Sequence, residues 1–391
     1  MSQNALRCGF IPLVDAAPLI VAHEMGFAAE QGIELVLEKQ PSWSALRDML
    51  VLERIEAAHM LAPVPVAMAL GLGGLPTRID ALMVLSVNGN TIGVSRALSA
   101  RMRDNGWTGD FLDPTGTGQH MIRATERRLR VGVPFPFSMH AELLYYWLGA
   151  LGMTTPDELD VRTVPPPQMA AAMAEGEIDA FCVGEPWGSI AVEGGIGDLV
   201  LPGSAIWRFA PEKVLAVRRD WAANNDTQTG ALMRAVSLAA RWLSQPENRM
   251  IASEFLARPD YLNISDNVID RALRGKIVTS PTTRATIVPG FLHFYTHCAN
   301  FPWRSQAAWI AERLARRTGL DRRASIAAGA ASFRPDIYRR HLAPLGLDMP
   351  GASAKVEGAL AQTEPVASTH GQINLGPDSF FDGVIFDPDA L

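Results

Sequence analysis

Between residue 6 and about residue 200, short apolar runs of strand length alternate with amphipathic runs of helix length. This alternation is typical of β-α units around mostly parallel sheets, and it restricts the chain to an α/β architecture. The predicted strands span residues 6–11, 33–38, 57–61, 82–87, 130–133, 161–164, 180–183 and 214–217. The predicted helices between them span residues 17–25, 43–53, 65–70, 95–103, 139–148, 168–174 and 187–192.

Beyond about residue 220 the pattern changes, and helices dominate. We predict them at residues 228–244, 247–257, 265–274, 290–299, 305–317 and 335–342. The stretch 312–340 holds eight arginines against three acids, so it is either a partner surface or a solvated helical face, and we favour the second. The acidic tail 350–391 is rich in Gly and Pro. We expect it to form loops that wrap the body through Phe380, Phe381 and Phe386.

Two interruptions favour two lobes over one wide sheet. The sequence NGNTIGVS at 88–95 is a Gly and Asn break between two strand-like runs, and VGEPWGS at 183–189 follows another strand. Two crossings between lobes would create a hinged cleft, where ligands are commonly held. We therefore expect a first lobe built from 1–93 and 206–349, a second lobe from 94–205, and the tail 350–391. The segment WTGDFLDPTGTGQH at 107–120 is predicted to be a surface loop.

Composition excludes several classes of protein. Of the 391 residues, 48% are apolar and 19% charged, so the chain has enough apolar material for a large core. A formal net charge of −6 without long blocks of like charge disfavours direct binding to DNA or RNA. Three dispersed cysteines predict buried thiols in a reducing compartment. We find neither a signal-peptide pattern nor a membrane-spanning run, and we expect a cytoplasmic protein.

No catalytic signature of a phosphate-binding loop, a nucleophile elbow or a zinc protease occurs, so we expect neither an enzyme nor a bound cofactor. His293 and His297 are four residues apart, a spacing that places two imidazoles on one helix face. No acid or third ligand accompanies them. Packing in a helix is therefore a better interpretation than metal binding, and we predict no metal site.

The segment after Pro41 predicts an anion-binding helix start. Ser42 is a suitable N-cap, which leaves the backbone N–H groups of Trp43 and Ser44 at the positive end of a helix. Trp43 would then cover a small planar anion, although an aromatic that staples the helix to the sheet is the commoner arrangement. Arg47 lies one turn further along and would face the same site, unless it pairs with an acid such as Asp48.

Two further residues carry the chemistry that an anion needs. His140 opens the helix after strand 130–133, where the helix start lowers the pKa of an imidazole and a bound anion raises it. Lys213 precedes a strand and would supply a full positive charge. For either residue alone, a solvated side chain is the simpler interpretation.

Around these residues the chain resembles the nitrate- and bicarbonate-binding proteins of the NrtA and CmpA type, solute-binding components of ABC transporters. The matching segments run in order from residue 9 to about 248: GFIPLVDAAPLIVAHEMGF, QPSWSALRDMLVL, AAHMLAPVP, VNGNTIGV, VPPPQM, FCVGEPW, PEKVLAVRRDW and QPEN. The resemblance implies a type II periplasmic-binding-protein fold, with two lobes, a hinged ligand cleft and a helical C-terminal extension.

The resemblance also implies site residues. The family's oxyanion-contacting tryptophan and histidine fall on Trp43 and His140, and its nitrate-binding lysine on Lys213. The family's cleft glutamine aligns with Asn90, a shorter amide, and the following glycine with Thr91. A lysine at 213 implies a monovalent oxyanion without a metal, since bicarbonate-binding relatives use an acid there beside a calcium ion.

Without an export signal, the chain is most similar to the cytoplasmic nitrate and nitrite sensors of the NasS type. In that group the sensor holds an RNA-binding ANTAR antiterminator, NasT, inactive until nitrate arrives. The resemblance therefore implies nitrate or nitrite as ligand and an antiterminator as protein partner, with no direct contact to nucleic acid or membrane. The alternative is a substrate-binding subunit of an ABC transporter for nitrate, bicarbonate or an organic solute.

Overall fold

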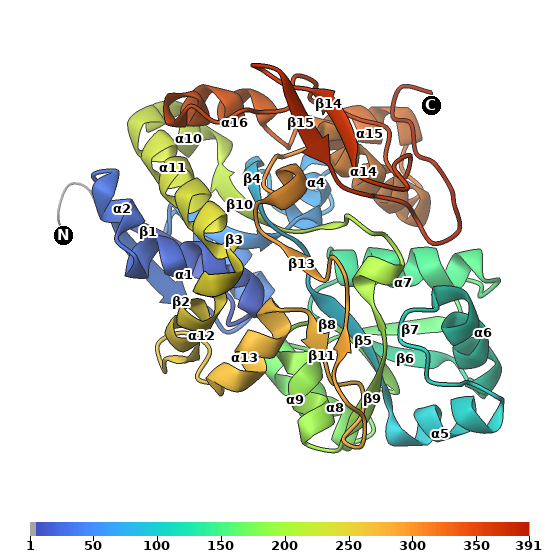
Figure 1. Cartoon of the computed structure of the whole chain (residues 1–391). Helices are drawn as coiled ribbons and strands as arrows, with labels where there is room; N and C mark the ends of the chain where they lie inside the picture. Colours follow the sequence, from blue (N-terminus) through green and yellow to red (C-terminus); the bar gives the residue numbers. More distant parts are fainter. Residues whose placement is uncertain (1–4, 391) are drawn as a thin grey trace.

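The computed structural model describes residues 5–390 and contains two large β-sheets, each the centre of one lobe (Figure 1). The strands of the first sheet are β1 (Ala5–Phe10), β2 (Glu34–Lys39), β3 (Ala57–Leu61), β4 (Ile79–Asn88), β10 (Pro211–Arg218) and β13 (Leu292–His293), in the order β13-β4-β10-β3-β1-β2. The second sheet contains β5 (Asn90–Ser95), β6 (Leu129–Val133), β7 (Leu159–Thr163), β8 (Ala180–Gly184) and β9 (Gly197–Pro202), in the order β7-β6-β8-β5-β9. Two short hairpins pair β11 (Lys276–Ile277) with β12 (Thr286–Ile287), and β14 (Glu364–Ala367) with β15 (Gln372–Leu375).

Helices cover both faces of each sheet. The helices of the first lobe are α1 (Ala17–Glu24), α2 (Phe27–Glu30), α3 (Trp43–Val51), α4 (Pro63–Ala69), α10 (Arg219–Asn224), α11 (Asp226–Leu243), α12 (Arg249–Ala257), α13 (Asp266–Leu273), α14 (Arg304–Thr318), α15 (Arg322–Ala330) and α16 (Pro335–Leu342). Those of the second lobe are α5 (Arg96–Asp104), α6 (Pro114–Ala124), α7 (Met139–Ala150), α8 (Met169–Ala174) and α9 (Trp187–Glu193). In the first lobe α1 and α11 pack on one face of the sheet, while α3, α4 and α14 pack on the other. None of these helices has the length and apolar character that crossing a bilayer requires.

The chain passes between the lobes at Gly89, the single residue between β4 and β5 (Figure 1). Asn88 and Gly89 have φ angles of +61° and +96°, and these left-handed conformations let the strand turn from one sheet into the other. The crossing therefore lies before the predicted boundary at residue 93, because residues 90–95 form β5 instead of a break. The return crossing lies between β9 and β10, a range that contains the predicted boundary at residue 205.

The predicted strands and most predicted helices overlap observed elements. Three predictions about elements were wrong: the interruption at 88–95, the loop at 107–120 and the helix at 290–299. Besides the interruption at 88–95, the loop predicted at 107–120 contains the start of α6. Asp113 caps this helix by accepting from the Gly116 N–H, and Pro114 follows at the first helical position, signals that outweigh the glycines. The helix predicted at 290–299 is instead β13 followed by the short 3-10 helix η5 (Thr296–Cys298), because β13 pairs with β4. Strand β9 was not predicted.

The tail, described to residue 390, wraps the body as predicted, although it was expected to form loops alone and also contains the β14–β15 hairpin. Phe380 stacks on Trp207 and Trp309, with ring centroids 4.7 and 5.7 Å apart, respectively. Phe381 and Phe386 pack against the same apolar cluster. The tail therefore belongs to the folded core of the molecule.

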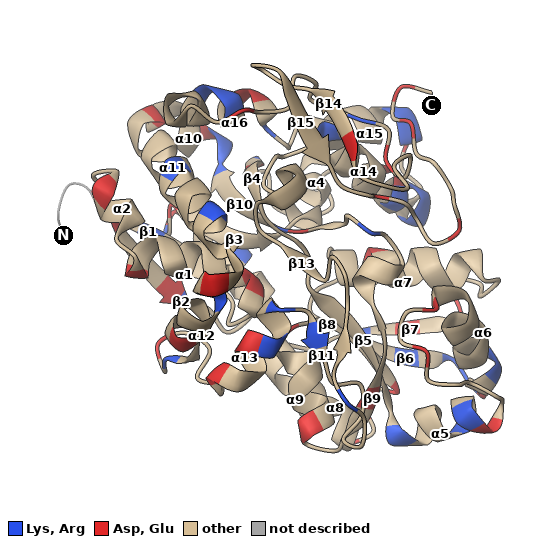
Figure 2. Ribbon diagram, viewed as in Figure 1, with Lys and Arg blue, Asp and Glu red and all other residues tan. Residues whose placement is uncertain are grey.

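Charged residues are interspersed over the outer helices and are scarce on the central strands (Figure 2). The arginines of 312–340 mostly serve the fold itself. Arg317 pairs with Glu142 of the second lobe, Arg334 with Asp80, and Arg339 donates to backbone carbonyls of residues 350–352. These contacts leave little of the stretch as a free cationic surface.

Candidate functional site

A buried group of polar side chains lies where the two lobes meet, and we call it the interlobe cluster. Its members from the first lobe are Asp15, Trp43, His59, Glu212 and Lys213, and its members from the second lobe are Asn90 and His140. Lys213 and His140 are 0% exposed and Trp43 is 1% exposed, so the lobes are closed over the cluster. Buried ionisable groups are expensive unless they are paired, which makes this group a candidate site.

Lys213 is the centre of the cluster. Its Nζ lies 2.8 Å from Oδ2 of Asp15, donates to Oε1 of Glu212 at 3.0 Å, and lies 5.6 Å from the centre of the Trp43 ring. Two carboxylates and an aromatic face therefore surround one ammonium group. Lys213 was predicted to supply a full positive charge or to be solvated, but it is buried and paired with a carboxylate on two sides.

Glu212 joins the lobes. Its Oε2 accepts a hydrogen bond from Nδ2 of Asn90 at 2.8 Å, and its Oε1 lies 3.0 Å from Nδ1 of His140. Both partners belong to the second lobe, whereas Glu212 lies on β10 of the first. On the other side of Lys213, Oδ1 of Asp15 lies 3.0 Å from Nε2 of His59.

The backbone explains how neighbouring residues of one strand reach the same cluster. Successive side chains of a regular strand point to opposite faces, so Glu212 and Lys213 would normally diverge. The pairing of β10 with β4 shifts register between Pro211 and Lys213 and again between Lys213 and Val214. Such an irregularity re-aims side chains, and here it lets the acid and the base contact each other.

Helix starts place the aromatic and the imidazole. Ser42 caps α3 as predicted, with its Oγ accepting from the Ala45 N–H at 3.2 Å, and Trp43 is the first residue of that helix. Ser138 caps α7 in the same way, so His140 lies in its first turn. Both helix starts therefore lie at the seam between the lobes.

Burial and neighbouring charges set the protonation of the cluster. Burial lowers the pKa of His140 well below its usual range, Lys213 lowers it further, and burial also lowers the pKa of His59. Burial disfavours the charged forms of Asp15 and Lys213. The attraction between the two charges outweighs this effect, so the pKa of Asp15 is lowered and the pKa of Lys213 is raised. Burial raises the pKa of Glu212 to about 7, against the pull of Lys213. At neutral pH the histidines are uncharged, and Glu212 is the group that titrates.

Several polar atoms of the cluster lack a hydrogen-bond partner among the described residues. These atoms include Nε1 of Trp43, Nε2 of His140 and Oδ1 of Asn90. A buried donor without a partner is costly, and most native structures avoid it. An acceptor that bridges the seam would remove this cost for the indole. It would do the same for the imidazole when Glu212 is protonated and donates to Nδ1, because the proton of neutral His140 is then on Nε2.

Four of the six predicted site residues, Trp43, Asn90, His140 and Lys213, come together in the cluster. Ser44 was predicted to contribute its backbone N–H at the start of α3, and that role stays a prediction. Its side chain is exposed, and its hydroxyl contacts that of Ser42. The Thr91 hydroxyl donates to Oε1 of Glu185 at 3.0 Å, since adjacent residues of β5 point to opposite faces.

The environment of Arg47 agrees with its alternative interpretation. It donates to Asp48 at 2.9 Å, and its guanidinium lies 5.8 Å from the ring centre of Phe135. It therefore pairs with the neighbouring acid.

Sequence reasoning missed Asp15, His59 and Glu212. Each carried a signal, because each is a polar residue inside an otherwise apolar stretch: LVDAA, AAHML and PEKVLAV, respectively. A charged residue in a buried run needs a partner, and these three partner one another through Lys213.

The predicted histidine pair has a different setting. His293 lies on β13 and His297 in η5, with ring centroids 5.8 Å apart, and Nδ1 of His293 contacts the Thr296 hydroxyl. The two residues therefore do not share one helix face. Within residues 5–390, no group of three or more His, Cys, Asp and Glu side chains is arranged to hold a metal ion. Cys8 and Cys182 are buried free thiols, as predicted, and Cys298 is half-buried.

Two α/β lobes, joined by crossing strands and closed over a buried polar cluster, define a solute-binding protein with a type II periplasmic-binding-protein fold. The chain belongs to the NMT1-like family, which matches residues 1–257. Within it, the chain is of the type represented by the NrtA and CmpA proteins, so the predicted family and fold are confirmed.

Three relatives illustrate this membership. The nitrate/nitrite binding protein NrtA of Nostoc is 30% identical over 98% of this chain and 83% of its own length. The crystal structure of the periplasmic nitrate-binding protein NrtA from Synechocystis superimposes with a TM-score of 0.85, at 27% identity, over 99% of this chain and 96% of that one. The nitrate import ATP-binding protein NrtC of Synechocystis is 34% identical over 81% of this chain, but the match spans only 46% of that longer relative.

Proposed function

We propose that the protein binds nitrate or nitrite in the interlobe cluster. The observation that carries the proposal is the pair of unpartnered buried nitrogen atoms, Nε1 of Trp43 and Nε2 of His140, around Lys213 at the seam. A small planar oxyanion offers several acceptor atoms to donors from both lobes. The NrtA relatives, which are nitrate or nitrite binding proteins, support the same ligand.

The energetics depend on the proton of Glu212. Hydrogen bonds to a charged group contribute about 1.5–3 kcal/mol each, so two or three donors offset part of the anion's lost hydration. With Glu212 ionised, two carboxylates face one ammonium, and an incoming anion is repelled. With Glu212 protonated, only one carboxylate faces the ammonium, and Lys213 together with the dipolar donors binds the anion without that repulsion.

We further propose that the protein acts in the cytoplasm as a sensor that controls an ANTAR-type antiterminator. Glu212 of the first lobe contacts Asn90 and His140 of the second lobe. These contacts support a mechanism in which closure of the two lobes depends on the groups at the seam. A ligand that binds only the closed form shifts the population toward it, and a partner that prefers the open form is released. A hundredfold change in partner affinity needs about 2.7 kcal/mol of coupling.

The second candidate function is that of a substrate-binding subunit of an ABC transporter. The match to periplasmic NrtA over nearly the whole chain supports it. The two candidates share the ligand site and differ in the partner, so an experiment on the partner separates them.

Calorimetry of the purified protein with nitrate, nitrite, bicarbonate and sulfate tests the ligand. We expect nitrate or nitrite to bind and sulfate not to bind. Trp43→Phe keeps the ring and removes the N–H, so it should weaken binding about tenfold, as the loss of a charge-assisted hydrogen bond predicts. The matched control is Trp303→Phe, which removes an equally buried and unpartnered indole N–H away from the seam and should leave binding unchanged. No binding of either nitrogen oxyanion would refute the proposal.

Pull-down of an ANTAR-domain protein with and without nitrate tests the partner. Retention without nitrate and release with nitrate would support the sensor. Equal recovery in both conditions would refute it, and capture by a transporter permease would favour the second candidate.

A further inference from the structure

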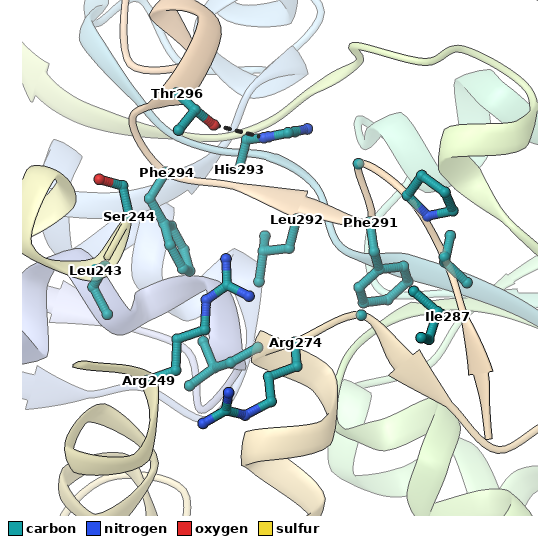
Figure 3. A pocket seen from close by; sticks show the side chains of 15 residues that line it. Leu243, Ser244, Arg249, Arg274, Ile287, Phe291, Leu292, His293, Phe294 and Thr296 are labelled. Atoms are coloured by element: carbon teal, nitrogen blue, oxygen red, sulfur yellow. Dashed lines mark hydrogen bonds between the residues drawn. The ribbon is translucent and has the colours of Figure 1, made fainter. Parts of the chain in front are cut away.

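A cavity lies beside the hinge, away from the interlobe cluster, and Gly290 in its wall accepts a hydrogen bond from Asn88. It has a volume of about 280 Å³, and none of its lining residues belongs to that cluster. Its walls come from the end of α11, the start of α12, the end of α13, and the segment from β12 through β13 (Figure 3).

The walls of this cavity are anchored in different lobes. Leu243 and Phe294 pack in the core of the first lobe, whereas Val288 and Phe291 pack with the core of the second. The β11–β12 segment is also tied to the second lobe through the Leu199 N–H, which donates to the carbonyl of Thr279. The chain thus reaches the second lobe again after residue 275, although 206–349 was predicted to lie in the first.

Two arginines line the cavity and give it an excess of positive charge. Figure 3 shows the guanidinium of Arg249 extending toward the middle of the lining residues, beside Arg274. Arg274 uses its Nε to donate to both carboxylate oxygens of Asp270, at 2.7 and 2.8 Å. The guanidinium of Arg249 makes no hydrogen bond or ion pair with any residue in 5–390. Burial and the charge of Arg274 lower its pKa, and the charge of Asp270 opposes them. The cavity therefore holds one guanidinium that is paired with a carboxylate and one that has no counterion in contact with it.

The other titratable side chain on the wall does not supply that counterion. His293 is an imidazole whose pKa is lowered to about 4 by burial, His297 and Arg249, so it is neutral at pH 7. Asp270, on the neighbouring turn of α13, is engaged by Arg274. Seven apolar side chains form one part of the wall: Leu243, Leu273, Ile287, Val288, Phe291, Leu292 and Phe294.

We infer that this cavity is a second ligand site, which takes a small organic carboxylate with an apolar body. The planar fork of Arg249 matches the two oxygens of a carboxylate, and the start of α12 favours the same charge. An inorganic oxyanion would place a strongly hydrated ion against Phe291 and Phe294, whereas an aromatic or aliphatic acid buries its body on them. The volume suits a ligand near the lower end of ordinary small-molecule sites.

Calorimetry with benzoate, hexanoate and inorganic phosphate tests this site on the full chain. We expect at least one of the two organic acids to bind, and benzamide, which has the same ring without the charge, not to bind. Arg249→Gln should weaken the carboxylate about tenfold, the typical loss of a hydrogen bond to a charged group. Arg241→Gln, which alters an exposed arginine near the end of α11 that does not line the cavity, is the matched control and should leave binding unchanged.

A variant of the interlobe cluster separates the two sites. In Asp15→Asn/Lys213→Met, carboxylate binding should persist whether or not nitrate binds. Failure of both organic acids to bind would overturn the inference. So would phosphate binding that matches theirs, or carboxylate binding that survives Arg249→Gln.

Discussion

The most informative residue of the site is Glu212, because it lies between the cation and the second lobe. Lys213 alone would have defined a simple anion site. The structure instead gives the ammonium two carboxylate partners, one of them with a pKa raised by burial to about 7. The net charge of the groups around Lys213 therefore changes with pH near 7, as Glu212 gains or loses its proton.

Nitrate binding should weaken as the pH rises through about 7. Ionisation of Glu212 adds a negative charge beside Lys213, and a bound anion in turn raises the pKa of Glu212, so binding takes up a proton. Calorimetry at pH values on both sides of 7, in buffers of different ionisation enthalpy, measures this uptake. Glu212→Gln has the same shape but no proton to gain, and its affinity should be independent of pH over this range. A wild-type affinity that is constant through pH 7 would contradict the assignment.

Lys213 should be needed for binding, and its loss also leaves Asp15 buried without its cation. Removing one partner of a buried ion pair costs roughly 3–5 kcal/mol, so Lys213→Met is expected to lower the free energy of unfolding by that order. Asp15→Asn/Lys213→Met removes both charges and should recover much of the stability, while nitrate affinity stays low. Urea denaturation and calorimetry measure the two quantities. Near-normal binding by the double variant would show that Lys213 does not contribute to affinity.

At the scale of elements, the decisive feature is the direct passage of β4 into β5 through Gly89. The Asn88 side chain fixes this passage by donating to the carbonyls of Arg208 and Gly290 and by accepting from the Ala210 N–H. These bonds tie the outgoing strand to the returning strand and to the residues before β13. The hinge is thus held by three segments that are distant in sequence.

Gly89→Ala should lower the free energy of unfolding by more than the cost of its left-handed backbone conformation, because the added Cβ would also collide with a neighbouring side chain. The φ of +96° costs a side chain about 1–2 kcal/mol, and a Cβ at this position would lie 2.9 Å from Cδ1 of Leu292. Gly71→Ala is the matched control, with a φ of +77° and no atom within 4 Å of the added Cβ. Thermal or urea unfolding should show a larger loss for Gly89→Ala, and Leu292→Ala should reduce that difference. Equal losses at both glycines would contradict a role for the Leu292 contact.

Element prediction succeeded where the local pattern was periodic and failed where turn residues and pairing competed. Asparagine and glycine at 88–90 indicate a break, yet tertiary pairing of Asn90–Ser95 with β8 and β9 makes that segment a strand. Likewise, the apolar and histidine spacing of 290–299 fits a helix, but β4 offers a free edge that pairs with Leu292 and His293. Both outcomes depend on strands that lie far away in sequence.

At the scale of the whole molecule, the C-terminal segments hold the second lobe in place. The Tyr146 hydroxyl, on α7, donates to Asp382 at 2.8 Å, and its ring lies 5.4 Å from that of Phe380. Arg317 of α14 pairs with Glu142, also on α7. Because α7 carries His140, the tail stabilises the helix that brings the imidazole to the seam (Figure 1).

Phe380→Ala should destabilise the protein by roughly 3–5 kcal/mol, the usual cost of emptying a large buried aromatic site. Phe380 is 3% exposed and stacks on two tryptophans, whereas Ile385 in the same tail is 59% exposed. Ile385→Ala is therefore the control and should change the free energy of unfolding little. Urea denaturation measures the stability, and limited proteolysis reports release of the tail. Equal effects of the two substitutions would show that the tail does not pack as described.

The sequence by itself determined the order of the elements, the two-lobed class, and the residue types that reach the cleft from helix starts, because periodicity, capping and turn chemistry act over a few residues. Trp43 and His140 became candidates in this way, and Lys213 became one through its charge, but the resemblance to a family assigned all three to the site and added Asn90. The tertiary structure decided that Asp15 and Glu212 neutralise Lys213, that Thr91 turns away, and that α14 and the tail clamp α7. These outcomes depend on burial and on contacts between distant segments, and local propensity carries no information about either.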